Sequence, residues 1–282
     1  MKLSNILKEA EDILSKSDID NHLKESKLII SHVLCAGLEV FILEPEKDIT
    51  SIQKNRIREL IKRRAKGEPV AYLKNSINFY KDFFYVNNSV LIPRPETEEL
   101  IETVLKNIPN KNIRLNILDI GIGSGIILAS LLKELPNAFG VGTDISIEAL
   151  KVANKNLHNL NIIKRSKLIN SNWSEGTKNN IFDIITCNPP YISNEYIKNL
   201  CNQVKNYEPL LALNGGINGL ESYKELLPLA RNAIKVSGLL ALEIGFDQSQ
   251  KLESILYKNK FLLKEVSKDL SGNNRVLLAE PF

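Results

Sequence analysis

A glycine-rich turn preceded by an acid is the first group of residues whose spacing points to chemistry. Residues 119–125 read Asp119-Ile120-Gly121-Ile122-Gly123-Ser124-Gly125, between a stretch typical of a strand and one typical of a helix. Open α/β sheets bind ligands at such turns, because glycine lets a ligand approach the backbone. A dinucleotide-binding turn would carry its third glycine at position 126, which is isoleucine here. The spacing therefore favours a ligand whose ammonium group contacts Asp119 over a ligand whose pyrophosphate binds at the N-terminus of the helix. A tight turn without a ligand is the other alternative.

Two further residues lie where the next strands of such a sheet would end. Asp144 ends the second expected strand, where its carboxylate can accept hydrogen bonds from both hydroxyls of a ribose. Trp173, the only tryptophan, follows the third expected strand in Asn172-Trp173-Ser174, at the rim where an adenine ring would lie. A partly buried structural tryptophan is the alternative for Trp173. With the glycine turn, these residues predict a site for a ligand that contains adenosine.

A second motif, Asn188-Pro189-Pro190-Tyr191, follows the fourth expected strand and so lies at the same edge of the sheet. A planar NH₂ group needs two hydrogen-bond acceptors, which the side-chain oxygen of Asn188 and the backbone carbonyl of Pro189 can supply. The prolines restrict the backbone that aims these acceptors, and Tyr191 can lie against the planar face of the target. The motif predicts a reaction at a planar amino or amide nitrogen, and a proline-rich turn without function is the alternative.

Metal-dependent and nucleophilic chemistry is not indicated by the remaining residues. The three histidines lack the spacing of metal ligands, so no metal site is predicted. Cys35, Cys187 and Cys201 are odd in number and form no C-x-x-C pair, which argues against a disulfide framework and a zinc ribbon. No Ser-His-Asp order stands out either.

The motifs need a sheet whose strands end at one edge, and the chain after Arg114 has this pattern. Stretches typical of strands alternate with stretches typical of helices, which describes a mainly parallel sheet covered by helices on both faces. The last two strands lie too close together for a helical crossover, so we expect an antiparallel pair. We expect strands at 115–120, ending at 144, near 168, and at 181–187, 239–244, 261–266 and 275–279, with helices at 125–135, 147–160 and 220–234.

The chain before this pattern divides into two further parts. Its first 76 residues have apolar side chains at helical spacing and predict a small helical domain. Residues 77–92 are rich in aromatic and β-branched side chains and predict a β-hairpin that turns at Lys81-Asp82. Pro93 and Pro95 then precede a helix whose first turn is acidic. We expect a substrate-recognition domain at 1–76, a hairpin linker at 77–94 and a catalytic domain at 95–282.

The composition is that of an ordinary globular protein, with 43% hydrophobic and 25% charged residues. No apolar run approaches the length of a bilayer span and the N-terminus lacks a signal-peptide core, so we expect a cytoplasmic protein without membrane contact. The net charge of +4 is unevenly distributed, because one segment sets seven basic residues against the single acid Glu59. This segment is either a solvated helix face or a partner-binding surface, and its basic residues are Lys54, Arg56, Arg58, Lys62, Arg63, Arg64 and Lys66.

With both motifs in place, the chain resembles the release factor glutamine methyltransferases, the HemK/PrmC type of class I methyltransferase, over nearly its whole length. The matching stretches also include Gly-Glu-Pro-Val-Ala-Tyr-Leu at 67–73, Leu-Ile-Pro-Arg-Pro-Glu-Thr-Glu at 91–98 and Tyr-Glu-Pro-Leu at 207–210. The resemblance implies a Rossmann-like fold and S-adenosyl-L-methionine as cofactor. The family usually has threonine where this chain has Ile122. The cofactor contacts that the resemblance implies are Gly121, Ile122, Gly123, Ser124, Gly125, Asp144, Trp173 and Asn188, and the substrate contacts are Asn188, Pro189, Pro190 and Tyr191.

The resemblance also implies a reaction. Members of this family methylate the side-chain amide nitrogen (N5) of the glutamine in the Gly-Gly-Gln motif of class 1 peptide chain release factors. The catalytic residues expected here are Asn188, Pro189 and Tyr191, and no side chain is assigned as general base. We expect a monomer that binds the release factor through its helical domain and holds no nucleic acid stably. One alternative is a nucleic-acid methyltransferase acting on an exocyclic base amino group, since adenine presents the same planar NH₂ group, and another is a binding module without activity.

Overall fold

The structure, a computed structural model, describes residues 1–17 and 19–282, which form two compact units. The helical unit comprises Met1–Ser76 and Cys201–Tyr207. The second unit, named the catalytic unit after the role expected from its sequence, comprises Ile77–Leu200 and Glu208–Phe282. Each unit has a hydrophobic core of its own. Among the described residues, no helix has the length and apolar character needed to cross a membrane.

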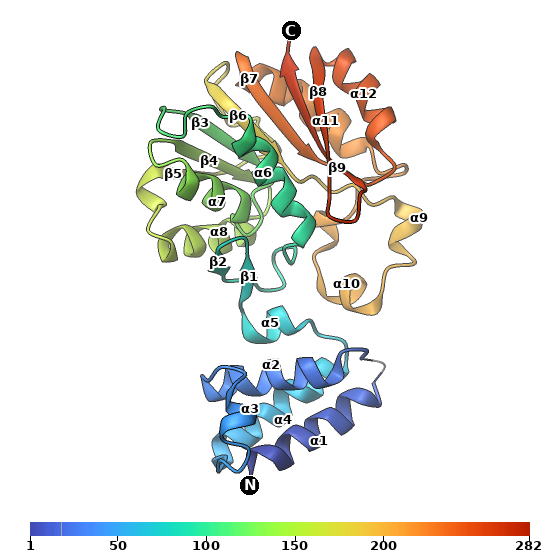
Figure 1. Ribbon diagram of the computed structural model, residues 1–282. Coiled ribbons are helices and arrows are strands. Elements are labelled where there is room, and N and C mark those ends of the chain that lie inside the picture. The colour runs from blue at the N-terminus through green and yellow to red at the C-terminus, as the bar shows by residue number, and fades with distance from the viewer. Residues whose placement is uncertain (18) are drawn as a thin grey trace. The chain divides into compact units, whose positions relative to one another are not determined.

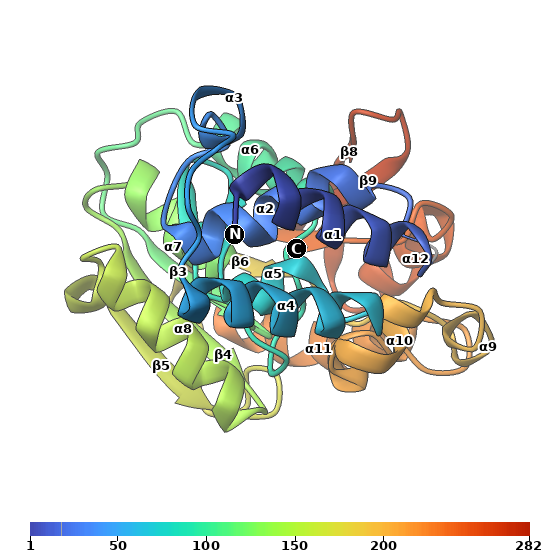
Figure 2. The same ribbon diagram turned by 90° about the horizontal axis from the view of Figure 1, so that it is seen from below.

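The helical unit consists of short helices, and the core it contains is formed by residues of the first 73 positions. The helices are α1 (Leu3–Ser15), α2 (His22–Leu34), α3 (Val40–Leu43), α4 (Ser51–Ala65), α5 (Val70–Lys74) and α10 (Asn202–Tyr207). In α1, Leu3, Ile6 and Leu14 recur at helical spacing and are buried. A capping box begins α4, in which Thr50 and Gln53 bond each other's backbone N–H groups. Within this unit α1, α2 and α4 pack against one another (Figures 1 and 2).

The segment Cys201–Tyr207 joins the helical unit although it is remote in sequence from the rest of that unit. Gln203 Oε1 accepts a hydrogen bond from Arg64 at 3.0 Å. The Tyr207 hydroxyl donates to the backbone carbonyl of Lys66 at 3.0 Å. The sequence-based division put this segment in the catalytic domain, because periodicity along the chain carries no information on such long-range contacts.

The arginines of the basic segment are engaged inside the helical unit. Arg58 donates to both carboxylate oxygens of Glu9, at 2.6 and 2.7 Å. Arg64 is buried and pairs with Glu25. Within the described chain, the bases of this segment that make no ion pair are Lys54, Lys62 and Lys66, whereas Arg56 pairs with Glu59, and Arg63 with Glu59 and Glu68.

The catalytic unit is built on a seven-stranded sheet with the order β5-β4-β3-β6-β7-β9-β8. Strands β5 to β7 of this order pair in parallel, whereas β9 is antiparallel to both β7 and β8. This sheet confirms the predicted α/β class. Its strands are β3 (Asn116–Ile120), β4 (Phe139–Asp144), β5 (Ser166–Asn170), β6 (Phe182–Cys187), β7 (Ile234–Glu243), β8 (Phe261–Lys268) and β9 (Asn274–Pro281).

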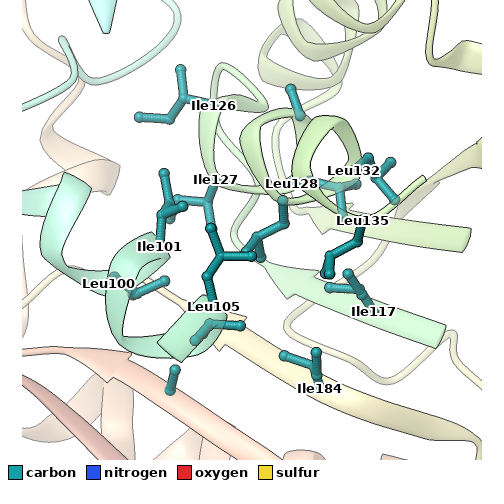
Figure 3. Packing of buried hydrophobic residues seen from close by; sticks show 14 of the residues in the cluster. Leu100, Ile101, Leu105, Ile117, Ile126, Ile127, Leu128, Leu132, Leu135 and Ile184 are labelled. Atoms are coloured by element: carbon teal, nitrogen blue, oxygen red, sulfur yellow. The ribbon is translucent and has the colours of Figure 1, made fainter. Parts of the chain in front are cut away.

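Helices cover both faces of this sheet (Figure 1). One core cluster joins α6 (Glu98–Lys106), α7 (Ile126–Glu134) and α8 (Ile147–Asn159) to the sheet, and the other joins α11 (Glu221–Ala233) and α12 (Ser249–Lys258). Figure 3 shows Ile101 and Leu105 of α6 beside Ile127 and Leu128 of α7. Because strands β3 to β7 pair in parallel, their carboxyl ends lie at one edge of the sheet.

The structure differs from the expected elements in the hairpin, at Pro95 and in several elements that were not predicted. The hairpin of β1 (Ile77–Phe79) and β2 (Asp82–Phe84) turns at Tyr80-Lys81, one residue early, because Tyr80 takes φ +55°. The expected start of a helix at Pro95 is a 3₁₀ turn, η1 (Pro95–Thr97), before α6. Helix α12 was not predicted, and neither were the short elements η2 (Ile163–Arg165), α9 (Asn194–Ile197) and η3 (Leu210–Ala212).

Candidate active site

The catalytic unit contains a cavity of about 540 Å³ lined by the loops that follow β3, β4 and β6. Because β3 pairs in parallel with both β4 and β6, these loops meet at one edge of the sheet. Asp119, Gly125 and Tyr191 are not among the described residues that line the cavity. The predicted residues that do line it come from both motifs and from the two further positions between them, and they are Gly121, Ile122, Gly123, Ser124, Asp144, Trp173, Asn188, Pro189 and Pro190.

The glycines of the first loop have different structural tasks. Gly121, Gly123 and Gly125 all take positive φ, at +69°, +53° and +82°, a region that side chains disfavour. A Cβ at Gly121 would meet nothing within 4 Å, so this position leaves room for a ligand. A Cβ at Gly125 would lie 3.3 Å from Ala153 of α8, so this glycine allows two helices to approach closely. Gly125 therefore serves packing in this structure, behind the loop that lines the cavity.

Asp144 joins the end of β4 to the glycine loop. Its carboxylate accepts backbone hydrogen bonds from Gly123 at 2.9 Å and Ser146 at 2.8 Å. Burial raises the pKa of Asp144, and the two N–H donors oppose that rise. Each oxygen retains acceptor capacity, so the carboxylate fits the two hydroxyls of a ribose.

Asp119 is fully buried at the end of β3, behind the cavity lining. Its Oδ1 accepts a hydrogen bond from Thr186 of β6 at 2.8 Å, while Oδ2 has no hydrogen-bond partner among the described residues. Burial raises the pKa of Asp119 to about 7. An ammonium group near this carboxylate would compensate a charge that is otherwise poorly satisfied. The contact between Asp119 and an ammonium group of the ligand stays a prediction. The carboxylate oxygen without a partner is consistent with it.

Trp173 lines the cavity with an orientation set by a residue that the sequence did not single out. Trp173 takes φ +47°, and its indole N–H donates to Glu225 of α11 at 3.0 Å. The cavity lining holds the carboxylates of Asp144, Glu221 and Glu225 but, among the described lining residues, the one base Arg94. Such an acidic lining favours a cationic ligand, for example one that carries a sulfonium and an ammonium group.

Asn188 lines the cavity directly after β6 and bonds to a residue from another element. Its Nδ2 donates to the hydroxyl of Thr97 at 3.4 Å, and Thr97 also lines the cavity. The side-chain oxygen of Asn188 is then the acceptor that remains for a bound amide. With Pro189 and Pro190 in the same lining, the structure brings the two predicted acceptors to the cavity that the glycine loop borders.

Tyr191 is held by two buried side chains, one at the end of β7 and one in the loop after it. Its hydroxyl donates to Glu243 at 3.2 Å, and its carbonyl accepts from Gln248 at 3.1 Å. Burial raises the pKa of Tyr191 well above its usual value. Because Tyr191 lies outside the cavity lining in this structure, its predicted stacking on the target stays a prediction.

Two buried side chains support the cavity walls without a signal in the local sequence. Glu208 accepts hydrogen bonds from the Arg94 guanidinium at 2.6 Å and from the backbone N–H of Ile92 at 3.1 Å, which fixes the wall segment after the hairpin. Asn156 of α8 donates to the Ser124 carbonyl at 2.8 Å, in the glycine loop. The Tyr-Glu-Pro-Leu stretch contained Glu208 but gave it no role, and Asn156 reads as an ordinary helix residue.

Comparisons with known proteins agree with this architecture. Residues 97–207 match the family model of the methyltransferase small domain, and residues 5–74 match that of the PrmC N-terminal domain. A solved methyltransferase from Pyrococcus furiosus has the same fold, with a TM-score of 0.53 at 19% identity over 82% of this chain and 98% of that one.

Full-length relatives identify the family. The release factor glutamine methyltransferase of Caulobacter vibrioides is 38% identical over 95% of this chain and 93% of its own length. That of Agrobacterium fabrum is 36% identical over 94% of this chain and 92% of its own length. A bifunctional methyltransferase of Rickettsia conorii is 33% identical over 99% of this chain, which spans 58% of that protein. The chain therefore belongs to the release factor glutamine methyltransferases, a family of S-adenosylmethionine-dependent enzymes.

Proposed function

We propose that this protein transfers the methyl group of S-adenosyl-L-methionine to the side-chain amide nitrogen (N5) of the glutamine in the Gly-Gly-Gln motif of class 1 peptide chain release factors. One observation carries the proposal. A single cavity is lined both by Asp144 with its glycine loop and by Asn188 with Pro189. In a family of release factor glutamine methyltransferases, this arrangement supports a cofactor site beside a pair of amide acceptors.

The residues at the substrate end explain how an amide can react. An amide nitrogen is a weak nucleophile because its lone pair is delocalised, so transfer depends on placement and on polarised N–H bonds. The side-chain oxygen of Asn188 and the carbonyl of Pro189 accept these two N–H bonds. S-adenosylmethionine supplies an electrophilic methyl group when bound. No cavity-lining side chain is assigned to remove the proton, which leaves toward these acceptors or water.

The residues at the cofactor end fit S-adenosylmethionine. Asp144 has acceptor capacity for the ribose, Gly121 leaves open space beside the loop, and Trp173 offers a flat apolar face for adenine. The orphaned oxygen of Asp119 suits a nearby ammonium group. We assign these residues to the cofactor.

The charge of the cavity argues against the nucleic-acid alternative. A nucleic-acid methyltransferase must hold phosphates with basic side chains near its active site. The described lining has three acids, and its one base, Arg94, is paired with Glu208. Exposed apolar residues Leu210, Leu211 and Ile217 lie in the loop that contributes to the lining, and they suit a protein loop better than a phosphate backbone.

We also propose that the helical unit binds the release factor in the cytoplasm and that the enzyme acts as a monomer. A site that recognises a primary amide cannot by itself select one glutamine among many, so selection needs a second surface. Arg56, Arg63 and Arg64 are not changed in the test, because each forms an ion pair with an acid of the helical unit. Charge reversal at exposed Lys62 and Lys66 should raise KM for intact release factor about threefold to tenfold without changing kcat. An unchanged KM would remove this face from the interface.

The experiment that tests the function uses full-length protein and methyl-labelled S-adenosylmethionine. It compares a purified class 1 release factor, the same factor with its Gly-Gly-Gln glutamine replaced by alanine, and duplex DNA and RNA. Label is expected in the first sample and in none of the others. Labelled nucleic acid with an unlabelled release factor would support the alternative reading, and no label in any sample would exclude both.

A further inference from the structure

We propose that Thr97 and Glu243 are positioning residues, which fix the side-chain amide of Asn188 so that its oxygen, and not its nitrogen, faces the substrate. The inference rests on the proposed function, because it concerns how Asn188 accepts an N–H bond of the glutamine amide. It addresses a problem of every catalytic asparagine. A rotated amide presents an NH₂ donor of the same shape, which would repel the substrate NH₂ group.

The first link runs from Asn188 to Thr97. Asn188 Nδ2 donates to Thr97 Oγ1 at 3.4 Å, and the Thr97 side chain is buried at 1% exposure. Thr97 comes from η1, which is 91 positions away in sequence from Asn188. A hydroxyl can donate as well as accept, so Thr97 alone does not decide which end of the Asn188 amide it meets.

The second link decides this polarity. Glu243 ends β7 and is buried at 1% exposure, and its carboxylate can only accept hydrogen bonds when ionised. Tyr191 donates to its Oε1 at 3.2 Å, whereas its Oε2 has no hydrogen-bond partner among the described residues. The Thr97 hydroxyl is close enough to this carboxylate to lower its pKa. Because a buried carboxylate with an unsatisfied oxygen is a stronger acceptor than a neutral amide, it takes the single Thr97 proton, and Thr97 Oγ1 is left to accept from Asn188.

This order of donors has a direct consequence at the cavity. Once Nδ2 of Asn188 is used by Thr97, its Oδ1 is the group that remains for the glutamine amide. A protonated Glu243 breaks the order, because its own O–H can donate to Thr97. The Thr97 proton is then free to point at Asn188, and the rotated asparagine becomes stable. Glu243 acts through Thr97 and does not itself line the cavity.

The surroundings of Glu243 make its ionisation relevant near neutral pH. Burial raises its pKa to about 7, against the stabilising influence of Thr97, of the Arg275 guanidinium on β9 and of Tyr191. Glu96 of η1 adds a repelling charge. Two further titratable side chains facing this group, Cys187 of β6 and Tyr223 of α11, have pKa values raised by burial and stay neutral at this pH. Glu243 is therefore the group of this cluster that changes charge near pH 7.

The test measures single-turnover methyl transfer to intact release factor and binding of S-adenosylmethionine for four full-length variants. Thr97→Val removes the hydroxyl and Thr97→Ser keeps it, while Glu243→Gln replaces the carboxylate with an amide that can donate to Thr97. Thr103→Val is the matched control, since Thr103 is also buried, at 2% exposure, and its hydroxyl bonds to Glu99 away from Asn188.

We expect Thr97→Val and Glu243→Gln to lower the transfer rate by about tenfold or more. Their affinity for S-adenosylmethionine should change little, and this retained binding shows that both variants fold. Thr97→Ser should recover most of the rate, and Thr103→Val should match the wild type. If Glu243→Gln and Thr97→Val keep the wild-type rate, the inference is wrong. A wild type that does not methylate the release factor at all refutes the proposed function instead.

The pH profile separates this role from simple support of the fold. The wild-type rate should rise as pH increases through about 7, because Glu243 gains its charge there. In Glu243→Gln this limb should vanish, leaving a low rate across the same range. A Glu243→Gln profile that keeps the wild-type limb would show that another group titrates and would overturn the assignment.

Discussion

The two ends of the cavity are held in place by different means. At the proposed cofactor end, the glycine loop is fixed by neighbours of its own strands, since Gly123 bonds to Asp144 and Ile122 bonds to the backbone of Thr143. At the proposed substrate end, the loop with Asn188 is fixed by side chains from remote elements, such as Thr97 and Gln248. A pocket can thus combine a locally encoded loop with one whose geometry depends on the whole fold.

The comparison is sharpest for the two buried carboxylates. Asp119 stands behind the glycine loop and Glu243 behind the Asn188 loop, and burial raises the pKa of each to about 7. Each accepts a hydrogen bond from one buried or partly buried hydroxyl and leaves one oxygen without a hydrogen-bond partner among the described residues. We expect the pKa of Asp119 to change when the cofactor binds, and the charge of Glu243 to affect the rate of methyl transfer.

The largest effect should come from the substrate end. Asn188→Ala removes an acceptor aimed at the target amide, so single-turnover transfer should fall about a hundredfold, as in other sites that lose one stabilising group. Cofactor affinity measured by calorimetry should change far less. A transfer rate within a few-fold of the wild type would contradict the assignment of Asn188 to the substrate end of the cavity.

The two glycines at the ends of the loop should respond differently to alanine. Gly125→Ala combines a positive φ with a contact to Ala153, so it should lower the free energy of unfolding by about 2 kcal/mol. Gly121→Ala is the matched variant, because its φ is also positive but its Cβ enters open space. We expect Gly121→Ala to be less destabilising and to weaken cofactor binding directly. Equal losses of stability in denaturant melts would contradict the packing role of Gly125.

Asp144→Ala should affect the cofactor end alone. Loss of charge-assisted hydrogen bonds to the ribose should weaken S-adenosylmethionine binding by about tenfold. At saturating cofactor, transfer by this variant should approach the wild-type rate, which is the opposite pattern from Asn188→Ala. Unchanged affinity in calorimetry would remove Asp144 from the site.

The smallest expected effect is the release of a fraction of a proton when the cofactor binds. Because the pKa of Asp119 is raised to about 7, this carboxyl is partly protonated at neutral pH, and a nearby ammonium group would lower its pKa. Binding at pH 7 should therefore release up to about half a proton, seen as different heats in buffers of different ionisation enthalpy. The release should disappear in Asp119→Asn and persist in Glu243→Gln. Equal heats in both buffers for the wild type would show that Asp119 does not meet the cofactor.

The same contrast explains how much the sequence could predict. The glycine loop, Asp144, Trp173 and the loop with Asn188 follow strands whose apolar pattern is clear, so their common edge follows from topology. The sheet and its antiparallel end were predicted correctly for the same reason. Gln248 and Glu243 have no local signature, and Thr97 has no predicted role within the matching stretch 91–98, because their contacts join segments that are 52 or more residues apart.

Some predicted residues have neighbours that the sequence did not indicate. Tyr191 is predicted to lie against the target, and buried partners hold its hydroxyl and carbonyl. Gly125 is predicted to contact the cofactor, and its neighbour in the structure is Ala153 of α8. The basic segment is predicted to be either a solvated face or a docking face, and its arginines pair with Glu9, Glu25 and other acids of the same unit. Sequence spacing locates residues along an element and says less about which neighbour they meet.

The most direct test of the central claim is the position of the added methyl group. Intact release factor is incubated with the enzyme and S-adenosylmethionine, digested, and fragmented in the mass spectrometer alongside a sample treated with Asn188→Ala. The account predicts one added methyl group on the side-chain amide of the Gly-Gly-Gln glutamine, strongly reduced in the variant sample. A methyl group on any other residue, or equal methylation by Asn188→Ala, would contradict it.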